Sequence, residues 1–239
     1  MCGEDRVDRH ELNKDAIAVA NRRRLLALCA HWMLRPLGYL ELTDVFRIEL
    51  ATLPPLFEVP GYAIVRADAA DIAYITSHIK RDEPSAVLDA LWTEGHHCFV
   101  AKIDGRVVAY NWIAFSAVQE EEYSYDPKPG HAICVDAYTV AEHRGKGLHY
   151  LLLLAMLHFA AESGKTTAYT GASLYNVVSW KSHLRMGWKR EFTFGWFRPY
   201  FTLKRYPWRL TAERYPLRLE WSRHAWFAPP SNTPRTNST

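Results

Sequence analysis

The middle of this 239-residue chain carries a basic glycine turn that joins a strand pattern to a long apolar helix pattern. The strand is predicted over residues 131–140. The helix runs from Leu148 for about sixteen residues to Ser163 and Gly164, where glycine is a common helix terminator. A strand that leads directly into a helix is typical of a layered fold, in which helices cover the faces of a sheet. The feature therefore predicts a domain of the α/β (α+β) class.

The segments on either side continue this alternation. Asp104 and Gly105 form a turn signal between two strand patterns and predict a hairpin, and Asp68 is placed to cap the start of a helix. The order of strands and helices predicts one domain with a mixed sheet. The predicted elements are strand 62–66, helices 68–80 and 84–92, strands 98–102, 107–115 and 131–140, the apolar helix, strand 166–171, helix 176–185, and strands 188–196 and 201–204.

The two ends of the chain differ in composition from this regular region. Residues 1–60 are predicted to form an N-terminal helical extension and linker, with a helix over 15–35 and a short strand over 45–50. That helix is expected to pack on the main domain, although a basic helix with a tryptophan also suits a membrane surface. The main domain is predicted over 61–204, and beyond it lie an aromatic and basic extension over 205–227 and a disordered tail over 228–239.

Composition excludes several classes of protein. The 29 basic and 26 acidic residues give a net charge of +3, which is too small for a dedicated nucleic-acid binder. The four cysteines are scattered without a CxxC pair, so neither a zinc site nor a disulfide framework is predicted, and a cytoplasmic location fits best. The longest apolar stretches are shorter than a bilayer span. We therefore expect no membrane span, while peripheral contact with a membrane stays open.

The turn from Arg144 to Gly147 has the chemistry of an anion site. Glycines at Gly145 and Gly147 allow a tight bend and a close approach of the backbone to a ligand. The first N–H groups of the following helix have no partner within the helix, and its positive dipole end faces the turn. Arg144 and Lys146 add charge to the same place. The segment favours a phosphate or diphosphate, although a solvent-exposed helix cap is the alternative.

This turn resembles the signature of the GNAT superfamily of N-acetyltransferases. In that family an Arg or Gln, two further residues, a Gly, one residue, and a Gly or Ala open the helix, and backbone amides there bind the diphosphate of CoA. Arg144 and Gly147 occupy the first two positions, but His149 stands where the family usually has Gly or Ala. The histidine would either crowd the phosphate or give it another hydrogen-bond donor, and the sequence leaves both outcomes open.

A second segment downstream is similar to the same family. There an Asn begins a helix, a small residue follows three positions later, a Tyr seven positions later, and Gly-Phe ends the segment. Asn176, Ser179 and the pair Gly187-Trp188 match in kind, and His183 falls at the Tyr position. The two motifs are spaced as in the family, so the resemblance covers the predicted main domain.

The resemblance implies a GNAT fold over 61–204, with a mixed central sheet of about six to seven strands and helices on both faces. The sheet would be splayed between its fourth and fifth strands, 131–140 and 166–171, where the pantetheine arm of CoA would lie. The implied co-substrate is acetyl-CoA, and no metal is expected. The cofactor-binding residues would be Tyr138, Thr139, Val140, Arg144, Gly145, Lys146, Gly147, Leu148, His149, Asn176 and Ser179.

The implied activity is transfer of an acetyl group to an amine by direct attack in a ternary complex. His183 is expected to give a proton to the departing thiolate, because the family's Tyr at this place lies near the CoA sulfur. Asp136 on the central strand is the expected base, with Glu120, Glu121 and Glu122 as alternatives.

The expected acceptor is a small-molecule or peptide amine, and no nucleic-acid partner is predicted. A homodimer stays open. Two other functions also stay open: a long-chain N-acyltransferase that takes its acyl group from an acyl-carrier protein, and a CoA-binding sensor or scaffold without turnover.

Overall fold

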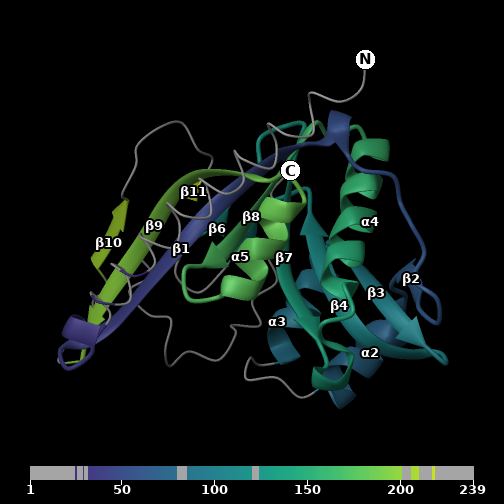
Figure 1. The fold of residues 1–239 in the computed structure, drawn as a ribbon, viewed down its shortest axis with the longest axis horizontal. Coiled ribbons are helices and arrows are strands. Elements are labelled where there is room, and N and C mark those ends of the chain that lie inside the picture. The colour runs from purple at the N-terminus through teal and green to yellow at the C-terminus, as the bar shows by residue number, and fades with distance from the viewer. Residues whose placement is uncertain are drawn as a thin grey trace, which may run out of the picture.

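The computed structural model describes residues 25, 29, 32–79, 85–119, 124–200, 206–209 and 217–218. An eight-stranded sheet dominates this part of the chain, with the strand order β10-β9-β1-β8-β7-β4-β3-β2 (Figure 1). All neighbouring strands are antiparallel except β7 and β8, which are parallel. The strands are β1 Gly38–Glu49, β2 Ala63–Arg66, β3 His97–Ile103, β4 Arg106–Ala114, β7 His131–Thr139, β8 Thr167–Ser173, β9 Lys189–Pro199 and β10 Tyr206–Arg209.

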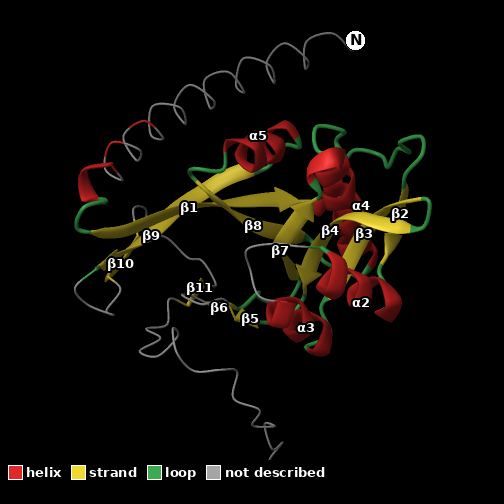
Figure 2. Cartoon of the chain, turned by 90° about the horizontal axis from the view of Figure 1, so that it is seen from below, coloured by secondary structure: helices red, strands yellow, loops and turns green. Residues whose placement is uncertain are grey.

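Helices cover both faces of this sheet, as Figure 2 shows. The helices α4 (Leu148–Glu162) and α5 (Val177–Arg185) pack on one face, and α2 (Ala69–His78) and α3 (Ser85–Thr93) pack on the other. Helix α4 is buried on most sides because its apolar residues do not form a single stripe. None of the described helices has the length and apolar character needed to cross a membrane.

Short elements complete the described chain. The 3-10 helices are η1 (Leu50–Thr52) and η2 (Ala141–His143), and a second, three-stranded sheet has the order β11-β6-β5. Its strands are β5 (Val118–Gln119), β6 (Ser124–Tyr125) and β11 (Leu217–Arg218).

The predicted mixed sheet with helices on both faces is confirmed, and six of its predicted strands correspond to β2, β3, β4, β7, β8 and β9. The sheet has eight strands instead of six to seven because β1 and β10 also belong to it. The predicted strand 201–204 and most of the predicted helix 15–35 lie outside the described residues.

Strand β1 is the largest difference from the sequence analysis. A short strand over 45–50 was expected there, whereas β1 has 12 residues and lies between β8 and β9 inside the main sheet. Leu40, Leu42, Phe46 and Ile48 all face the core, so the alternation begins earlier than expected. The predicted domain boundary at residue 61 stays a prediction, but a strand from the preceding segment is central to the sheet.

Candidate functional site

The parallel pairing of β7 with β8 ends halfway along β7. The two strands pair from His131 with Thr167 to Cys134 with Thr170, and β7 then continues for five residues to Thr139. Among the described strands, this second half of β7 pairs with β4 alone. Ala137 is exposed although it lies on an inner strand. The sheet is therefore splayed at the predicted place, with one edge of β7 left open.

A β-bulge lies within this open half. Asn111 is opposite Ala137 and Trp112 is opposite Val135, so Asp136 is the extra residue on β7. A bulge bends its strand and changes the direction of a side chain, and bulges are common beside active sites. Burial, and next the nearby charge of Asp136, raise the pKa of the Cys98 thiol. Asp136 therefore lies near Cys98, whose side chain belongs to the α2 and α3 face of the sheet.

The basic glycine turn follows directly after β7. Gly145 and Gly147 have φ values of 76° and 78°, which L side chains rarely adopt. A Cβ at either position would meet no other atom of the protein within 4 Å. The positive φ, and not steric crowding by protein atoms, is therefore what favours glycine at these two positions. Residues 144–147 are all exposed.

Aromatic side chains hold this turn against the sheet. The Arg144 side chain donates from Nε to the Thr139 carbonyl at 3.0 Å and lies 5.8 Å from the Tyr138 ring. The Tyr62 hydroxyl lies 2.9 Å from His143 Nδ1, and the Lys146 ammonium lies 5.9 Å from the Tyr62 ring. Two cations are therefore kept at the start of α4.

Helix α4 begins without a cap of its own. Gly147 is the N-cap residue, no side chain accepts a hydrogen bond there, and the first turn contains no acidic residue. The first-turn amides of Leu148 and His149 have no acceptor within the helix. Cations beside the positive end of a helix dipole are unfavourable, whereas an anion there is favourable. The arrangement suits an anion that comes from outside the chain.

Val140, one of the predicted cofactor-binding residues, has a backbone N–H that is already bonded within the sheet. The N–H of Val140 donates to the Val108 carbonyl at 3.0 Å, as part of the β4 side of the strand. Pairing of a ligand with β7 would therefore use the opposite edge, before Val140.

The His149 side chain turns inward under α4. Its Nδ1 lies 3.4 Å from the Asn111 amide nitrogen, and its ring centre lies 5.9 Å from that of His183. Burial lowers the pKa of His149. Among the described residues, the His149 Nε2 and the Asn111 Oδ1 are buried without a hydrogen-bond partner. The contacts of the ring are with β4 and α5, so the histidine fills the space below the turn.

His183 is almost completely buried between α5 and the sheet. Its ring stacks on Phe46 at 5.3 Å, meets Trp188 edge-on at 5.5 Å, and lies with Nδ1 3.5 Å from the Ser179 hydroxyl. Burial, and next the neighbouring His149, lower the pKa of His183 to about 3, although Ser179 acts in the opposite direction. The imidazole is therefore neutral near pH 7, when it can donate a hydrogen bond but is not an effective proton donor.

Helix α5 is capped and held by side chains. As the sequence suggested, Asn176 begins the helix, and its Oδ1 accepts a hydrogen bond from the Ser179 N–H at 3.1 Å. The buried Asp44 on β1 accepts from Trp180 Nε1 at 2.9 Å and also from the Thr193 hydroxyl. Sequence reasoning missed Asp44, because its partners lie more than a hundred residues away and no local pattern indicates them.

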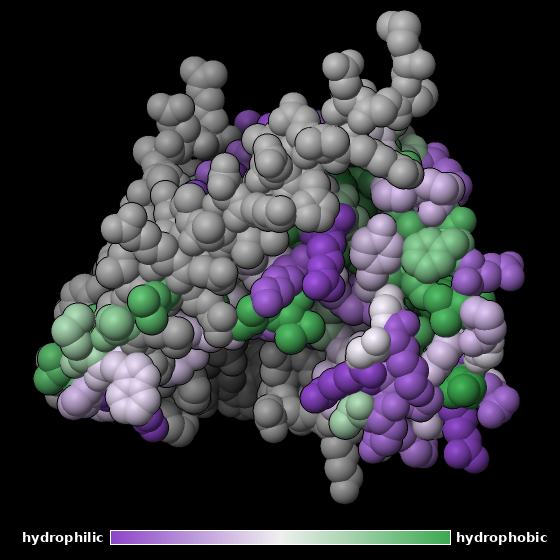
Figure 3. Space-filling view, in the orientation of Figure 1, coloured by the Kyte–Doolittle hydropathy of each residue, from purple (hydrophilic) through white to green (hydrophobic). Residues whose placement is uncertain are grey.

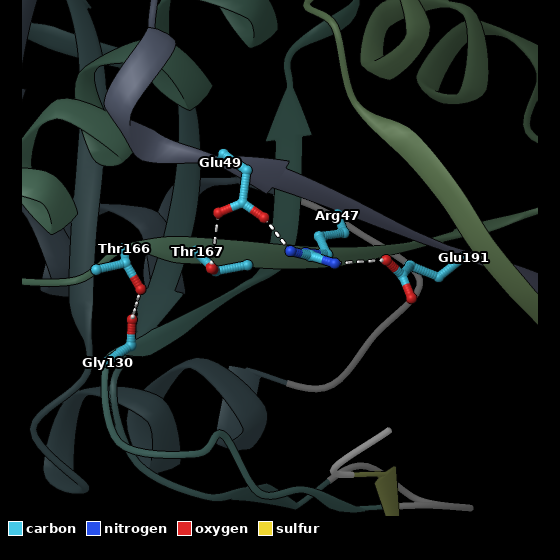
Figure 4. Close-up of polar contacts among 6 residues, drawn as sticks. All are labelled: Arg47, Glu49, Gly130, Thr166, Thr167 and Glu191. Atoms are coloured by element: carbon cyan, nitrogen blue, oxygen red, sulfur yellow. Dashed lines mark hydrogen bonds and ion pairs between the residues drawn. The ribbon is translucent and has the colours of Figure 1, made fainter. Parts of the chain in front are cut away.

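The closed half of the splay is stabilised by polar contacts (Figure 4). Arg47 on β1 binds Glu49 and Glu191, and Glu49 accepts from the Thr167 hydroxyl at 3.1 Å. The Thr166 hydroxyl donates to the Gly130 carbonyl at 3.3 Å. These contacts join β1, β8 and β9 and tie the start of β8 to the residue before β7, where the two strands remain paired.

Other predicted groups lie outside this arrangement. Glu120, Glu121 and Glu122, the alternative bases, are outside the described residues. Within the described chain, no three histidine, cysteine, aspartate or glutamate side chains gather as metal ligands would.

Several solved structures are similar to parts of the chain. A GNAT-family protein from Novosphingobium aromaticivorans has 19% identity and a TM-score of 0.48, over 64% of this chain and 62% of that one. A Drosophila protein has 16% identity and a TM-score of 0.52, over 75% and 56%. A tandem GNAT protein from the clavulanic acid biosynthesis pathway has 15% identity and a TM-score of 0.50, over 68% and 55%. The matches thus span about three fifths of those proteins or slightly less.

The family comparison is more specific than the structural one. No curated protein matches the chain in sequence. The family model for GNAT acetyltransferases matches residues 66–188, from the end of β2 to the residue before β9, and this range includes the splay, the glycine turn and α5. More than half of the chain is covered, and the chain belongs to the GNAT acetyltransferase family.

Proposed function

We propose that this protein transfers an acetyl group from acetyl-CoA to an amine by direct attack in a ternary complex. The observation that carries the proposal is the uncapped, cationic start of α4 beside the open edge of β7. Family membership supports acetyl transfer as the class of reaction. The free thiols of the buried Cys98 and Cys134 fit the cytoplasmic location that we propose.

The diphosphate of CoA would bind at the glycine turn. Amides of the first turn of α4 would donate to its oxygens, and Arg144 and Lys146 would offset its charge. From there the pantetheine arm would lie along the open edge of β7, from Thr139 and Tyr138 toward Val135, and bond to the backbone as an added strand does. A backbone N–H on this edge would also stabilise the oxyanion of the tetrahedral intermediate.

The amine would attack from the side of Asp136. Attack forms the C–N bond, the nitrogen loses a proton to Asp136, and collapse breaks the C–S bond. His183 would act near the sulfur through a hydrogen bond from its neutral ring, because a pKa of about 3 leaves it without the acidic imidazolium proton near pH 7. The thiolate would then take its proton from solvent.

A CoA-binding protein without turnover is the second candidate function. The observation in its favour is the burial of His183, which lowers its pKa to about 3, so that the side chain predicted to give a proton to the thiolate is neutral near pH 7. This protein would hold CoA at the same turn but would not accelerate transfer.

Two measurements separate these functions. Calorimetry with CoA tests the binding site, and incubation with acetyl-CoA and a panel of amines, with release of free thiol as the readout, tests turnover. Thiol release that falls in the Asp136→Asn variant, while CoA affinity is kept, supports catalysis. Clear CoA binding without thiol release for any amine would favour the second function, and no heat with CoA would contradict both.

A further inference from the structure

The two longest strands of the sheet extend beyond their neighbour. β1 pairs with β9 from Gly38 onward, whereas β8 pairs with β1 only from Thr43. The extension forms an arm that projects from the body in Figure 1, on the side away from α4. Exposed apolar and aromatic side chains gather at its end, which we call the arm tip: Trp32, Met33, Leu37, Tyr39 and Tyr200.

The arm tip is held by regular contacts. The Leu37 N–H donates to the Leu34 carbonyl at 2.8 Å, and the Tyr200 N–H donates to the Leu37 carbonyl at 3.0 Å. Leu40 and Leu42 behind the tip are buried in a small cluster with Leu174. Hydrophobic surface is visible at this end of the arm in Figure 3. The backbone thus presents these side chains to solvent from a supported turn.

The helix that leads into the arm continues the apolar surface. Leu25, Cys29, Trp32 and Met33 are helical and exposed, and their spacing of four, seven and eight residues places them on one side of the helix. Trp32 and Met33 are 68% and 72% exposed, which is far more than large apolar side chains usually are. Contiguous apolar surface of this kind indicates an interaction site.

The charge of the segment between Asp15 and Glu41 indicates what kind of partner this surface would bind. Between Asp15 and Glu41 the sequence has no acidic residue and has four arginines, Arg22, Arg23, Arg24 and Arg35. The Arg35 guanidinium lies 5.8 Å from the Trp32 ring, so a cation and an interfacial aromatic residue are side by side. Tryptophan and leucine on one side, with several arginines in the same segment, is the pattern of a helix that lies on an anionic bilayer. The nearest acidic side chain, Glu41 on β1, accepts a hydrogen bond from the Tyr39 hydroxyl at 2.9 Å.

We propose that the arm tip and the exposed stripe of the preceding helix dock on an anionic phospholipid surface. The apolar side chains would enter the interface between headgroups and acyl chains, and Arg35 beside Trp32 would pair with a lipid phosphate. Because α4 lies at the other side of the molecule (Figure 1), the glycine turn would stay accessible to solvent. The docking would bring the enzyme close to amines at the membrane surface.

Vesicle flotation of the full chain tests this proposal. Phosphatidylcholine vesicles with and without phosphatidylserine are compared at low and high salt. We expect the chain to float only with the anionic vesicles, and the Trp32→Ser/Met33→Ser double variant to bind them about tenfold more weakly. The control is Leu56→Ser, which removes an equally apolar, 54% exposed side chain from the segment before β2 and should bind as the wild type does.

Equal melting temperatures and equal heats with CoA would show that the double variant is folded. The proposal is overturned if the wild type floats with neither vesicle, or if the double variant and the wild type bind equally. It is also overturned if sedimentation shows that the wild type and Leu56→Ser are dimers and the double variant is a monomer, because the surface would then join two copies of the chain. Capture of an acidic acyl-carrier protein without vesicle binding would likewise overturn it. None of these outcomes depends on turnover at the glycine turn.

Discussion

Helices α2 and α4 begin in opposite ways. At α2 the Asp68 carboxylate accepts from the Asp71 N–H at 2.9 Å, the Asp71 carboxylate accepts from the Asp68 N–H at 3.2 Å, and both charges suit the helix dipole. At α4 the N-cap is Gly147, no side chain caps the helix, and the two nearby charges are positive. One helix supplies its own acceptors and the other leaves that role to a ligand.

This difference identifies a binding site, because the start of α4 lacks stabilising interactions that the start of α2 has. A capping residue contributes about 1 kcal/mol to helix stability, and α4 lacks one although it is the longest described helix. Cations at its positive end add a further unfavourable interaction. An anion bound at the end of the splayed strand would offset this local loss of helix stability.

The largest expected effect comes from a variant that removes the difference between the two helices by placing an acidic residue at the start of α4. In Gly147→Asp the new carboxylate can serve as a local acceptor, and Asp is one of the residues that tolerate a positive φ. It would also repel the CoA diphosphate at close range. We expect CoA binding at least about a hundredfold weaker by calorimetry, with a decrease in melting temperature that reflects the positive φ and that the control below shares.

The matched control for this variant is Gly105→Asp in the hairpin between β3 and β4. Gly105 has a φ of 75°, and a Cβ at this position would meet no atom within 4 Å, so the backbone cost is the same. It should bind CoA as the wild type does. Wild-type affinity in Gly147→Asp would show that the start of α4 is not the anion site.

The buried His183, which lies below the glycine turn, allows a second test through the pH dependence of stability. The folded pKa of His183 is about 3, below the ordinary value of 6.5, so the folded protein binds fewer protons than the unfolded chain. Stability is then complete above pH 6.5 and falls as the pH decreases toward 3. Between pH 7 and pH 5 the loss from this residue is about 2 kcal/mol.

His183→Phe should remove that part of the loss, because phenylalanine can stack on Phe46 without taking up a proton. Urea unfolding at pH 7 and pH 5 measures the effect. The variant should still lose some stability in acid, since the pKa of His149 is lowered too. An equal acid loss in variant and wild type would mean that His183 is not held neutral by burial.

The sequence predicted those features that depend on neighbouring residues. The starts of α2 at Asp68 and α5 at Asn176, the glycine turn and the splay follow from local patterns and from the family motifs. The extent of β1 and the role of Asp44 could not be predicted in this way. Asp44 has meaning only through Trp180 and Thr193, which the fold brings to it from distant segments.

The direction of His149 was also beyond the sequence. Its position at the phosphate motif suggested contact with the ligand, whereas its ring lies against Asn111 and His183. A side chain in the first turn of a helix can point outward or inward, and packing against β4 and α5 decides between them. The role of a motif residue thus depended on contacts that the motif does not contain.

Helix α5 sharpens the comparison at intermediate size, because it is capped like α2 but carries the second motif. Asn176→Ala removes the acceptor of the Ser179 N–H and should lower the free energy of unfolding by about 1 kcal/mol. Asn176→Asp keeps an acceptor at the same place and should retain most of the stability. Urea unfolding compares the three proteins. If alanine and aspartate were equivalent, the cap would contribute nothing and Asn176 would be free to serve a ligand instead.

The smallest effect concerns the charge beside α4. Lys146 is exposed, so water and salt screen its attraction for a diphosphate. Lys146→Ala should weaken CoA binding by about threefold at low salt, and the difference from wild type should shrink as salt increases. The control Lys189→Ala removes an equally exposed charge from β9 and should leave the affinity unchanged. If both variants bind CoA equally weakly, the affinity depends on the net charge of the protein and not on the position of the cation. A loss confined to Lys146 would show that the cation acts locally, at the helix start that lacks an acid.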